Sequence, residues 1–269
     1  MAEAHDPIGI LDSGVGGLSV LREIRKLLPY EDFLYYADSA NCPYGIRSPE
    51  EIRKLTQRVA TILLERGAKA LVIACNTAST HSVAYLRQLW LQIPIVGMVP
   101  AVKPAAGYTR NGVVGVLATE ATSRAPALQD VIERFAGDKK VLISAPPGLV
   151  ELVESGNTES AETCAILKTH LDPLVAQGVD ALVLGCTHFP FLRPLIESIY
   201  GDKLLVIDSG EAVARQTCRI LENNGLLNLK ATSGTLTIFT SGNSQQVGVI
   251  TQKLLKMDSV PAVKFIIKS

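Results

Sequence analysis

Two cysteines, Cys75 and Cys186, occupy matching places in this sequence of 269 residues. Each follows a short aliphatic run and precedes polar residues, Asn-Thr after the first and Thr-His after the second. A single cysteine is most often a small buried hydrophobe, but matching positions at two strand ends favour a chemical role. We therefore predict that both sulfurs emerge at the carboxyl edge of a sheet, where ligands collect in α/β proteins.

Three further residues could act as acids or bases beside these thiols. Asp12 ends the first aliphatic run and opens the turn Asp-Ser-Gly-Val-Gly-Gly, whose main-chain amides and following helix could hold an anionic group. His188 lies two residues after Cys186, close enough for its imidazole to act as an acid or base next to the sulfur. Glu154 ends an apolar stretch before a glycine, so it either lines a site or faces solvent.

The glycine-rich turn also approaches a dinucleotide-binding pattern. Gly14 and Gly16 fit G-x-G-x-x-G, but Ser19 stands where the third glycine is needed. The sequence has no G-x-x-x-x-G-K-[ST] motif, so it does not support nucleoside triphosphate binding of the P-loop type. A carboxylate ligand suits the turn better.

The other three cysteines are assigned no chemistry. Cys164 and Cys218 lie within helical patterns and are expected in the core, whereas Cys42 lies in a turn-like loop without a base beside it. No two cysteines form a C-x-x-C pair, which disfavours both a disulfide framework and a zinc site. We expect free thiols and no bound metal.

The composition excludes several classes of protein. Lys plus Arg and Asp plus Glu both total 26, and no basic run is interleaved with aromatic residues, so nucleic acid is not an expected partner. A hydrophobic content of 47% with only 5% aromatic residues is typical of an α/β protein with aliphatic strands. The N-terminus has neither a basic start nor a long apolar stretch, which predicts a cytoplasmic protein without a membrane anchor.

Aliphatic runs that alternate with helical patterns predict the framework for these residues. Ser48, Pro49 and Glu51 form a capping box with a first-turn proline, which marks the start of a helix that Gly67 ends. Short aliphatic runs between helices indicate buried parallel strands joined by βαβ crossovers. The predicted strands are 8–11, 33–36, 70–73, 113–117, 141–143, 181–184 and 204–207.

An internal repeat indicates how the strands are divided. The separations from Gly67 to Gly178 and from Cys75 to Cys186 are both 111 residues, and the segments around them are similar. A weaker similarity pairs 9–13 with 115–119. Two long repeats favour a duplicated α/β domain over a solenoid, with the active site in the cleft between the halves. We predict two pseudo-symmetric Rossmann-like lobes with mainly parallel sheets, formed by 1–98 plus 209–269 and by 99–208.

Five motifs, in order along nearly the whole chain, resemble those of the glutamate racemases in the aspartate/glutamate racemase superfamily. The cysteine motifs are the ones that mark the superfamily. The motifs are Asp12-Ser13-Gly-x-Gly-Gly, Pro43-Tyr44-Gly45, Ala74-Cys75-Asn76-Thr77-Ala78-Ser79, Ala118-Thr119-x-x-Thr122 and Gly185-Cys186-Thr187-His188-Phe-Pro190.

The resemblance implies an enzyme that interconverts L- and D-glutamate without a cofactor and supplies D-glutamate for peptidoglycan. It also implies a homodimer. Cys75 and Cys186 would be the two acid/base residues, with Asp12 assisting the first and His188, together with Glu154, assisting the second. The substrate-binding residues implied by position are Asp12, Ser13, Pro43, Tyr44, Gly45, Asn76, Thr77, Thr119, Thr122, Thr187 and His188.

Two thiols suit the inversion of a carbon centre. A proton must leave one face of the carbon and another must arrive on the opposite face, so acid/base groups have to flank it. A free thiol has a pKa of about 8.5, so at neutral pH one cysteine can act as thiolate base while the other acts as thiol acid. The roles exchange with the hand of the substrate.

Three alternatives remain at this point. Aspartate or another small acidic compound could be the substrate, because the superfamily shares the two-cysteine plan. Cys186 with His188 could instead form a covalent thioester in a hydrolase, which leaves Cys75 unexplained. The glycine-rich turn could belong to a nucleotide-binding regulatory module, for which it is the only motif.

Overall fold

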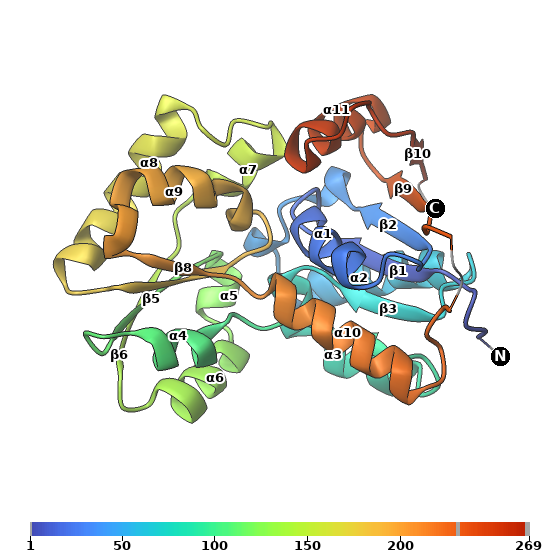
Figure 1. The fold of residues 1–269 in the computed structure, drawn as a ribbon, viewed down its shortest axis with the longest axis horizontal. Helices are drawn as coiled ribbons and strands as arrows, with labels where there is room; N and C mark the ends of the chain where they lie inside the picture. The colour runs from blue at the N-terminus through green and yellow to red at the C-terminus, as the bar shows by residue number, and fades with distance from the viewer. Residues whose placement is uncertain (1, 230–231, 267–269) are drawn as a thin grey trace. The chain divides into compact units, whose positions relative to one another are not determined.

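The computed structural model describes residues 2–229 and 232–266. Contacts within the chain divide it into two compact units, Met1–Met98 with Gly210–Ser269 and Val99–Ser209. Each unit contains its own sheet, in which all neighbouring strands are parallel (Figure 1). The predicted α/β class with parallel sheets is therefore confirmed.

The sheet of the first unit has six strands in the order β10-β9-β2-β1-β3-β4. The central strands β1 and β3 are buried along their whole length, as expected for aliphatic strands with helices on both faces. The strands are β1 (Ile8–Asp12), β2 (Phe33–Ala37), β3 (Ala70–Ile73), β4 (Ile95–Val96), β9 (Leu236–Thr240) and β10 (Val263–Phe265).

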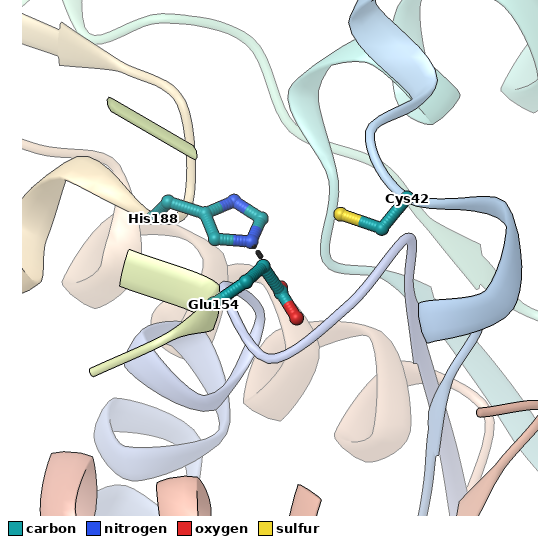
Figure 2. A group of neighbouring side chains, drawn as sticks. All are labelled: Cys42, Glu154 and His188. Carbon is teal, nitrogen blue, oxygen red and sulfur yellow. Dashed lines mark hydrogen bonds and ion pairs between the residues drawn. The ribbon is translucent and has the colours of Figure 1, made fainter. Parts of the chain in front are cut away.

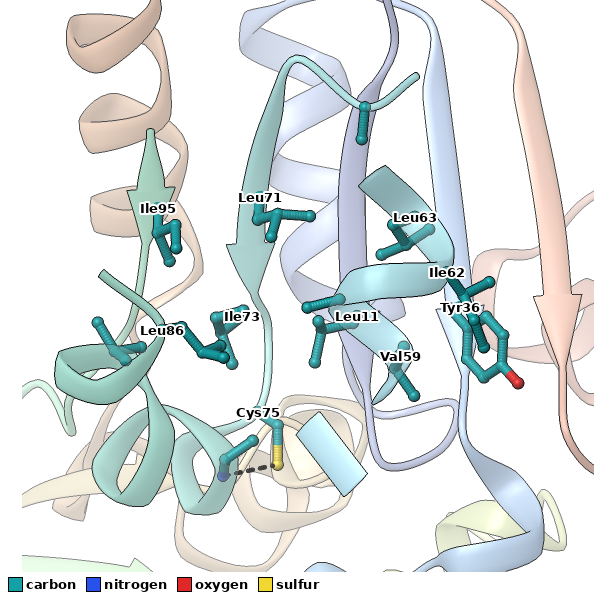
Figure 3. Packing of buried hydrophobic residues seen from close by; sticks show 14 of the residues in the cluster. Leu11, Tyr36, Val59, Ile62, Leu63, Leu71, Ile73, Cys75, Leu86 and Ile95 are labelled. Atoms are coloured by element: carbon teal, nitrogen blue, oxygen red, sulfur yellow. Dashed lines mark hydrogen bonds between the residues drawn. The ribbon is translucent and has the colours of Figure 1, made fainter. Parts of the chain in front are cut away.

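Helices of the first unit pack on both faces of this sheet. α2 (Pro49–Leu64) and α3 (Asn76–Leu89) cover the face that carries Leu11, Leu71 and Ile73, as Figure 3 shows. The side chain of Ile10 points to the opposite face, since side chains alternate along a strand. On that face α1 (Leu18–Leu27) packs against α10 (Gly210–Asn223) and α11 (Ser244–Leu255).

The start of α2 is the capping box that the sequence predicts. The Ser48 hydroxyl accepts a hydrogen bond from the Glu51 amide at 3.3 Å, and the Glu51 carboxylate accepts one from the Ser48 amide at 3.0 Å. Gly67 follows the helix end with φ +84°, a left-handed conformation that glycine adopts without strain.

The second unit contains a four-stranded sheet in the order β6-β5-β7-β8. Its strands are β5 (Val113–Ala118), β6 (Lys140–Ser144), β7 (Ala181–Gly185) and β8 (Leu205–Ile207). α4 and α6 pack on one face around Val116 and Val183. The helices are α4 (Val102–Tyr108), α5 (Glu120–Ser123), α6 (Pro126–Ala136), α7 (Leu149–Glu154), α8 (Ala161–Ala176) and α9 (Arg193–Tyr200).

The strand orders of the two units reveal the duplication. The order β2-β1-β3-β4 in the first sheet corresponds to β6-β5-β7-β8 in the second. Gly9 in β1 and Gly115 in β5 hold equivalent places, because the nearest side chains to a Cβ at each come from equivalent residues. These are Ala68, Leu71 and Leu63 for Gly9, and Val179, Leu182 and Leu174 for Gly115.

The structure corrects two expectations from the sequence. Three strands were not predicted: β4 with two residues, β9 with five and β10 with three. Cys164 and Cys218 lie in helices as predicted, but both are only half-buried. The buried stripe of each helix passes through the preceding residue, Thr163 in α8 and Thr217 in α10.

Among the described helices, none combines the length and apolarity needed to span a bilayer.

Candidate active site

Cys75 lies where β3 ends and α3 begins. Its sulfur caps α3 by accepting a hydrogen bond from the Ala78 amide at 3.4 Å, which Figure 3 shows as a dashed line. The thiol also contacts the Ser13 hydroxyl at 3.8 Å, and the residue is only 5% exposed. A helix N-terminus carries partial positive charge, and the sulfur of Cys75 lies directly at this end of α3.

Asp12 ends β1, the strand next to β3, and is fully buried. Its carboxylate accepts a hydrogen bond from the Gly14 amide at 2.8 Å, which turns the chain into α1. The main-chain carbonyl of Asp12 accepts a bond from the Asp38 amide at 3.0 Å. The ends of the neighbouring strands β1 and β3 therefore bring Asp12, Ser13 and Cys75 to one edge of the sheet.

Asn76 follows Cys75 and has an unusual environment. Its side chain is buried, yet neither its amide nitrogen nor its amide oxygen has a hydrogen-bond partner within the described part of the chain. Leaving both groups of a buried amide unpaired costs free energy. A polar ligand beside Cys75 would supply the missing partners. Thr77, next along α3, is also buried.

Pro43, Tyr44 and Gly45 lie in the loop that follows β2. Tyr44 is 1% exposed, and its hydroxyl donates to Asp38 Oδ2 at 2.6 Å. Burial and the neighbouring Asp38 raise the pKa of Tyr44 well above its ordinary value. The phenol is therefore a neutral donor engaged within the protein.

In the second unit, Cys186 follows β7 directly and has a different partner. Its sulfur lies 3.7 Å from Nδ1 of His188, and the cysteine and histidine are 6% and 1% exposed. Nε2 of the same imidazole lies 2.6 Å from Glu154 Oε1 (Figure 2). Glu154 ends α7 and keeps 19% of its side chain exposed. Figure 2 also draws Cys42, which belongs to the loop after β2 in the first unit.

The remaining predicted residues of this unit are polar groups near its strand ends. Thr119 caps α5, accepts a hydrogen bond from the Thr122 amide at 3.3 Å and donates to the Thr122 hydroxyl at 3.0 Å. Thr122 is fully buried, and Thr187, between the cysteine and the histidine, is 2% exposed. These hydroxyls follow β5 and β7, which pair in the sheet.

Each unit thus gathers its own share of the predicted residues. The first contains Asp12, Ser13, the 43–45 loop and Cys75 to Thr77, and the second contains the two threonines after β5 together with Cys186 to His188 and Glu154. The sequence analysis missed Asp38, whose carboxylate accepts hydrogen bonds from Tyr44, Arg58 and Ser241. Asp38 lies two residues after the predicted strand 33–36, which was the available signal for it.

Known proteins share the sequence and the fold of this chain. The family described as Asp/Glu/Hydantoin racemase matches residues 8–217. The chain belongs to this family. It is 51% identical to the glutamate racemase of Herpetosiphon aurantiacus over 248 residues, which cover 92% of this chain and 97% of the relative.

Solved structures of family members have the same fold. Glutamate racemase isoform RacE1 from Bacillus anthracis superposes with a TM-score of 0.86 at 32% identity, covering 99% of this chain and 98% of that one. Escherichia coli glutamate racemase, in complex with L-glutamate and the activator UDP-MurNAc-ala, gives 0.84 at 34% identity over 97% and 98% of the two chains. The resemblance inferred from the motifs is therefore confirmed at the level of the family.

Proposed function

We propose that this chain interconverts L- and D-glutamate without a cofactor, with Cys75 and Cys186 as the two acid/base groups. The observation that carries the proposal is the pair of buried thiols at equivalent strand ends, each with its own polar partner. The relatives that the chain matches over nearly its whole length are glutamate racemases, which favours glutamate as the substrate.

In the proposed reaction, one cysteine thiolate removes the α-proton of glutamate and the other thiol delivers a proton to the opposite face. The mechanism requires both sulfurs to reach the same carbon. Asn76, Thr77 and Thr187 are neutral donors suited to the substrate carboxylate, whose negative charge grows as the proton leaves. Neutral donors stabilise this charge without pairing permanently with a thiolate.

The two cysteines have different assistants in this proposal. Asp12, on the strand beside Cys75, assists the first thiol. His188 assists Cys186, and Glu154 orients the imidazole through its bond to Nε2. The residues proposed to hold the substrate are those named from the motifs: Asp12, Ser13, Pro43, Tyr44, Gly45, Asn76, Thr77, Thr119, Thr122, Thr187 and His188.

The proposal also covers the compartment, the oligomeric state and the use of the product. We propose that the enzyme acts in the cytoplasm as a homodimer and that its D-glutamate is used for peptidoglycan. The activator in the E. coli glutamate racemase complex, UDP-MurNAc-ala, is a muramic acid derivative, which supports a link between this family and the cell wall.

Racemisation in heavy water tests the function. Each enantiomer of glutamate should gain deuterium at Cα as it is converted into the other enantiomer. Circular dichroism measures the conversion, and mass spectrometry measures the deuterium. Replacing either Cys75 or Cys186 by alanine should reduce turnover by at least about a hundredfold, the scale of one general acid–base contribution. Cys164→Ala and Cys218→Ala are matched controls, because both thiols lie in helices away from the two strand ends.

Four outcomes would contradict the proposal. Glutamate that stays optically unchanged would exclude the activity, and faster racemisation of aspartate would change the substrate. Inversion without deuterium uptake would exclude proton exchange with solvent. An acyl adduct on Cys186, detected by mass, would favour the covalent hydrolase alternative.

A further inference from the structure

Asp38 is a fully buried carboxylate that receives side-chain hydrogen bonds from four residues. It follows β2 and opens the 39–47 loop, which contains Pro43, Tyr44 and Gly45. We propose that Asp38 and Ser241 are positioning residues that hold this loop in its substrate-binding shape. The inference rests on the proposed function, because the loop matters only if glutamate binds there.

The bonds to the Asp38 carboxylate tie the loop to itself and to α2. Within the loop, the Tyr44 hydroxyl donates to Oδ2 at 2.6 Å and the Asn41 amide donates to Oδ1 at 3.0 Å. From α2, the Arg58 guanidinium donates to Oδ1 and Oδ2 at 3.0 and 3.2 Å. A charged acceptor with several donors gives strong, directional bonds. The carboxylate therefore fixes both the middle of the loop and its distance from α2.

Ser241 connects the same carboxylate to the C-terminal part of the chain. Its hydroxyl donates to Asp38 Oδ1 at 2.6 Å and accepts from the Ala40 amide at 3.2 Å. β9 pairs with β2 so that Ala37 lies opposite Thr240, which places Asp38 and Ser241 next in register. At the following residue, a Cβ on Gly242 would lie 3.0 Å from Ser39 Cβ. The turn after β9 therefore packs directly on the loop.

Asp38 also connects the loop to the Cys75 side of the site. Its amide donates to the main-chain carbonyl of Asp12 at 3.0 Å. On the far side of the loop, Arg47 Nε donates to the Asn41 carbonyl at 2.8 Å. A shift of Asp38 would therefore move the 43–45 segment relative to Asp12, the residue proposed to assist Cys75.

The hydrogen bond between Tyr44 and Asp38 determines the role of the phenol in the proposed site. Its phenol is committed to Asp38, and the raised pKa of Tyr44 keeps it protonated across the range in which thiols titrate. We infer that the loop meets the substrate through main-chain groups of 43–45, and that the phenol acts only by holding them in place.

Single variants with a matched control test this inference. Tyr44→Phe and Ser241→Ala should each raise KM for both enantiomers roughly tenfold, since each removes one hydrogen bond to a charged group. The value of kcat should change less than about threefold, because the acid/base groups stay in place. Tyr200→Phe is the control: its hydroxyl also donates to an aspartate, Asp172, at 2.7 Å, but in α9 of the second unit. Its KM should equal that of the wild type.

A double-mutant cycle tests whether both hydroxyls act through Asp38. In an Asp38→Ala background, adding Tyr44→Phe or Ser241→Ala should raise KM by less than about twofold, because the shared acceptor is gone. Asp38→Asn should restore part of the lost affinity, since its amide oxygen still accepts hydrogen bonds. Melting temperatures of all variants identify any that do not fold, and the Tyr44 and Ser241 single variants carry the test in that case.

The possible outcomes separate the two proposals. If the wild-type protein does not racemise glutamate, the proposed function fails first. If the wild type is active but Tyr44→Phe and Ser241→Ala keep the wild-type KM, the positioning role is wrong and the function stands. A full additional rise in KM on Tyr44→Phe in the Asp38→Ala background would show that the phenol meets the substrate itself and would also overturn the inference.

Discussion

At the scale of single residues, the two thiols are equivalent in the fold but differ in their surroundings. Cys75 caps a long helix and contacts Ser13, whereas Cys186 lies beside His188, which is bonded to Glu154. In the proposed mechanism the first thiolate is stabilised by helix-terminal amides, and the second exchanges its proton next to an imidazole. The two thiols therefore occupy equivalent positions in the fold but have different polar partners.

This difference predicts unequal effects on the two directions of racemisation. Asp12→Asn and His188→Asn should each lower kcat by roughly ten- to a thousandfold, and by different factors for L- and D-glutamate. Because the enantiomers have equal free energies in water, kcat/KM must remain equal in the two directions for every variant. A difference between the two directions can therefore appear only in kcat and KM taken separately. Both are measured by circular dichroism, starting from each pure enantiomer.

His170→Asn is a suitable control for the histidine variant. His170 belongs to the same unit and its Nδ1 lies 3.0 Å from the Ser144 hydroxyl, but it is not among the proposed site residues. His170→Asn should leave kcat unchanged for both L- and D-glutamate. Equal losses of kcat in both directions for Asp12→Asn and His188→Asn would count against the assignment of each to one thiol.

At the scale of elements, close packing of a helix end on a central strand is repeated in both units. A Cβ on Gly9 would lie 2.9 Å from Ala68 Cβ, and one on Gly115 would lie 2.8 Å from Val179 Cγ1. In both units the contacted residue directly follows a left-handed glycine, Gly67 or Gly178. Strand and helix approach so closely that only a residue without a side chain fits.

The repeated contact predicts a stability loss at both glycines. Gly9→Ala and Gly115→Ala should each lower the free energy of unfolding by about 1–3 kcal/mol, because an added methyl overpacks the interface. Gly107→Ala is the control: it lies in α4 with no atom within 4 Å of an added Cβ. It should be neutral or slightly stabilising, since alanine favours a helix. Urea unfolding of the three variants would measure these free energies. A loss of unfolding free energy in Gly107→Ala as large as in the other two variants would contradict the prediction.

At the scale of the whole molecule, chain segments far apart in sequence build one proposed loop site. The C-terminal turn after β9 supports the 39–47 loop, although Ser241 lies beyond the 8–217 segment that matches the family. The first unit is itself discontinuous, since Met1–Met98 joins Gly210–Ser269. Its proposed substrate loop therefore depends on Ser241, which lies 203 residues after Asp38 in the sequence.

Binding of glutamate should stabilise the whole folded protein. Glutamate at about a hundred times its dissociation constant should stabilise the folded protein by roughly 2.7 kcal/mol, which raises the melting temperature by several degrees. In the wild type both enantiomers should give the same shift, because each is racemised during the scan. In a Cys75→Ala, Cys186→Ala double variant the two shifts can differ. Aspartate at equal concentration should give a smaller shift, and an equal one would question the preference for glutamate.

The sequence by itself predicted seven of the strands, the start of α2 and the twin cysteines. These features depend on neighbouring residues: aliphatic runs such as 70–73 form strands, and Ser48 with Glu51 caps a helix through residues three apart. The repeat across Cys75 and Cys186 is visible because it preserves spacing. The short strands β4 and β10 and the half-exposure of Cys164 and Cys218 were not predictable in this way.

Only the tertiary structure decided which distant side chains meet. Glu154 could equally have faced solvent, and its bond to His188 spans 34 residues of sequence. The contact of Ser241 with Asp38 spans 203 residues and follows from the pairing of β9 with β2. Such contacts depend on strand order and register, which arise from burying the whole apolar core. No local pattern around either residue encodes them.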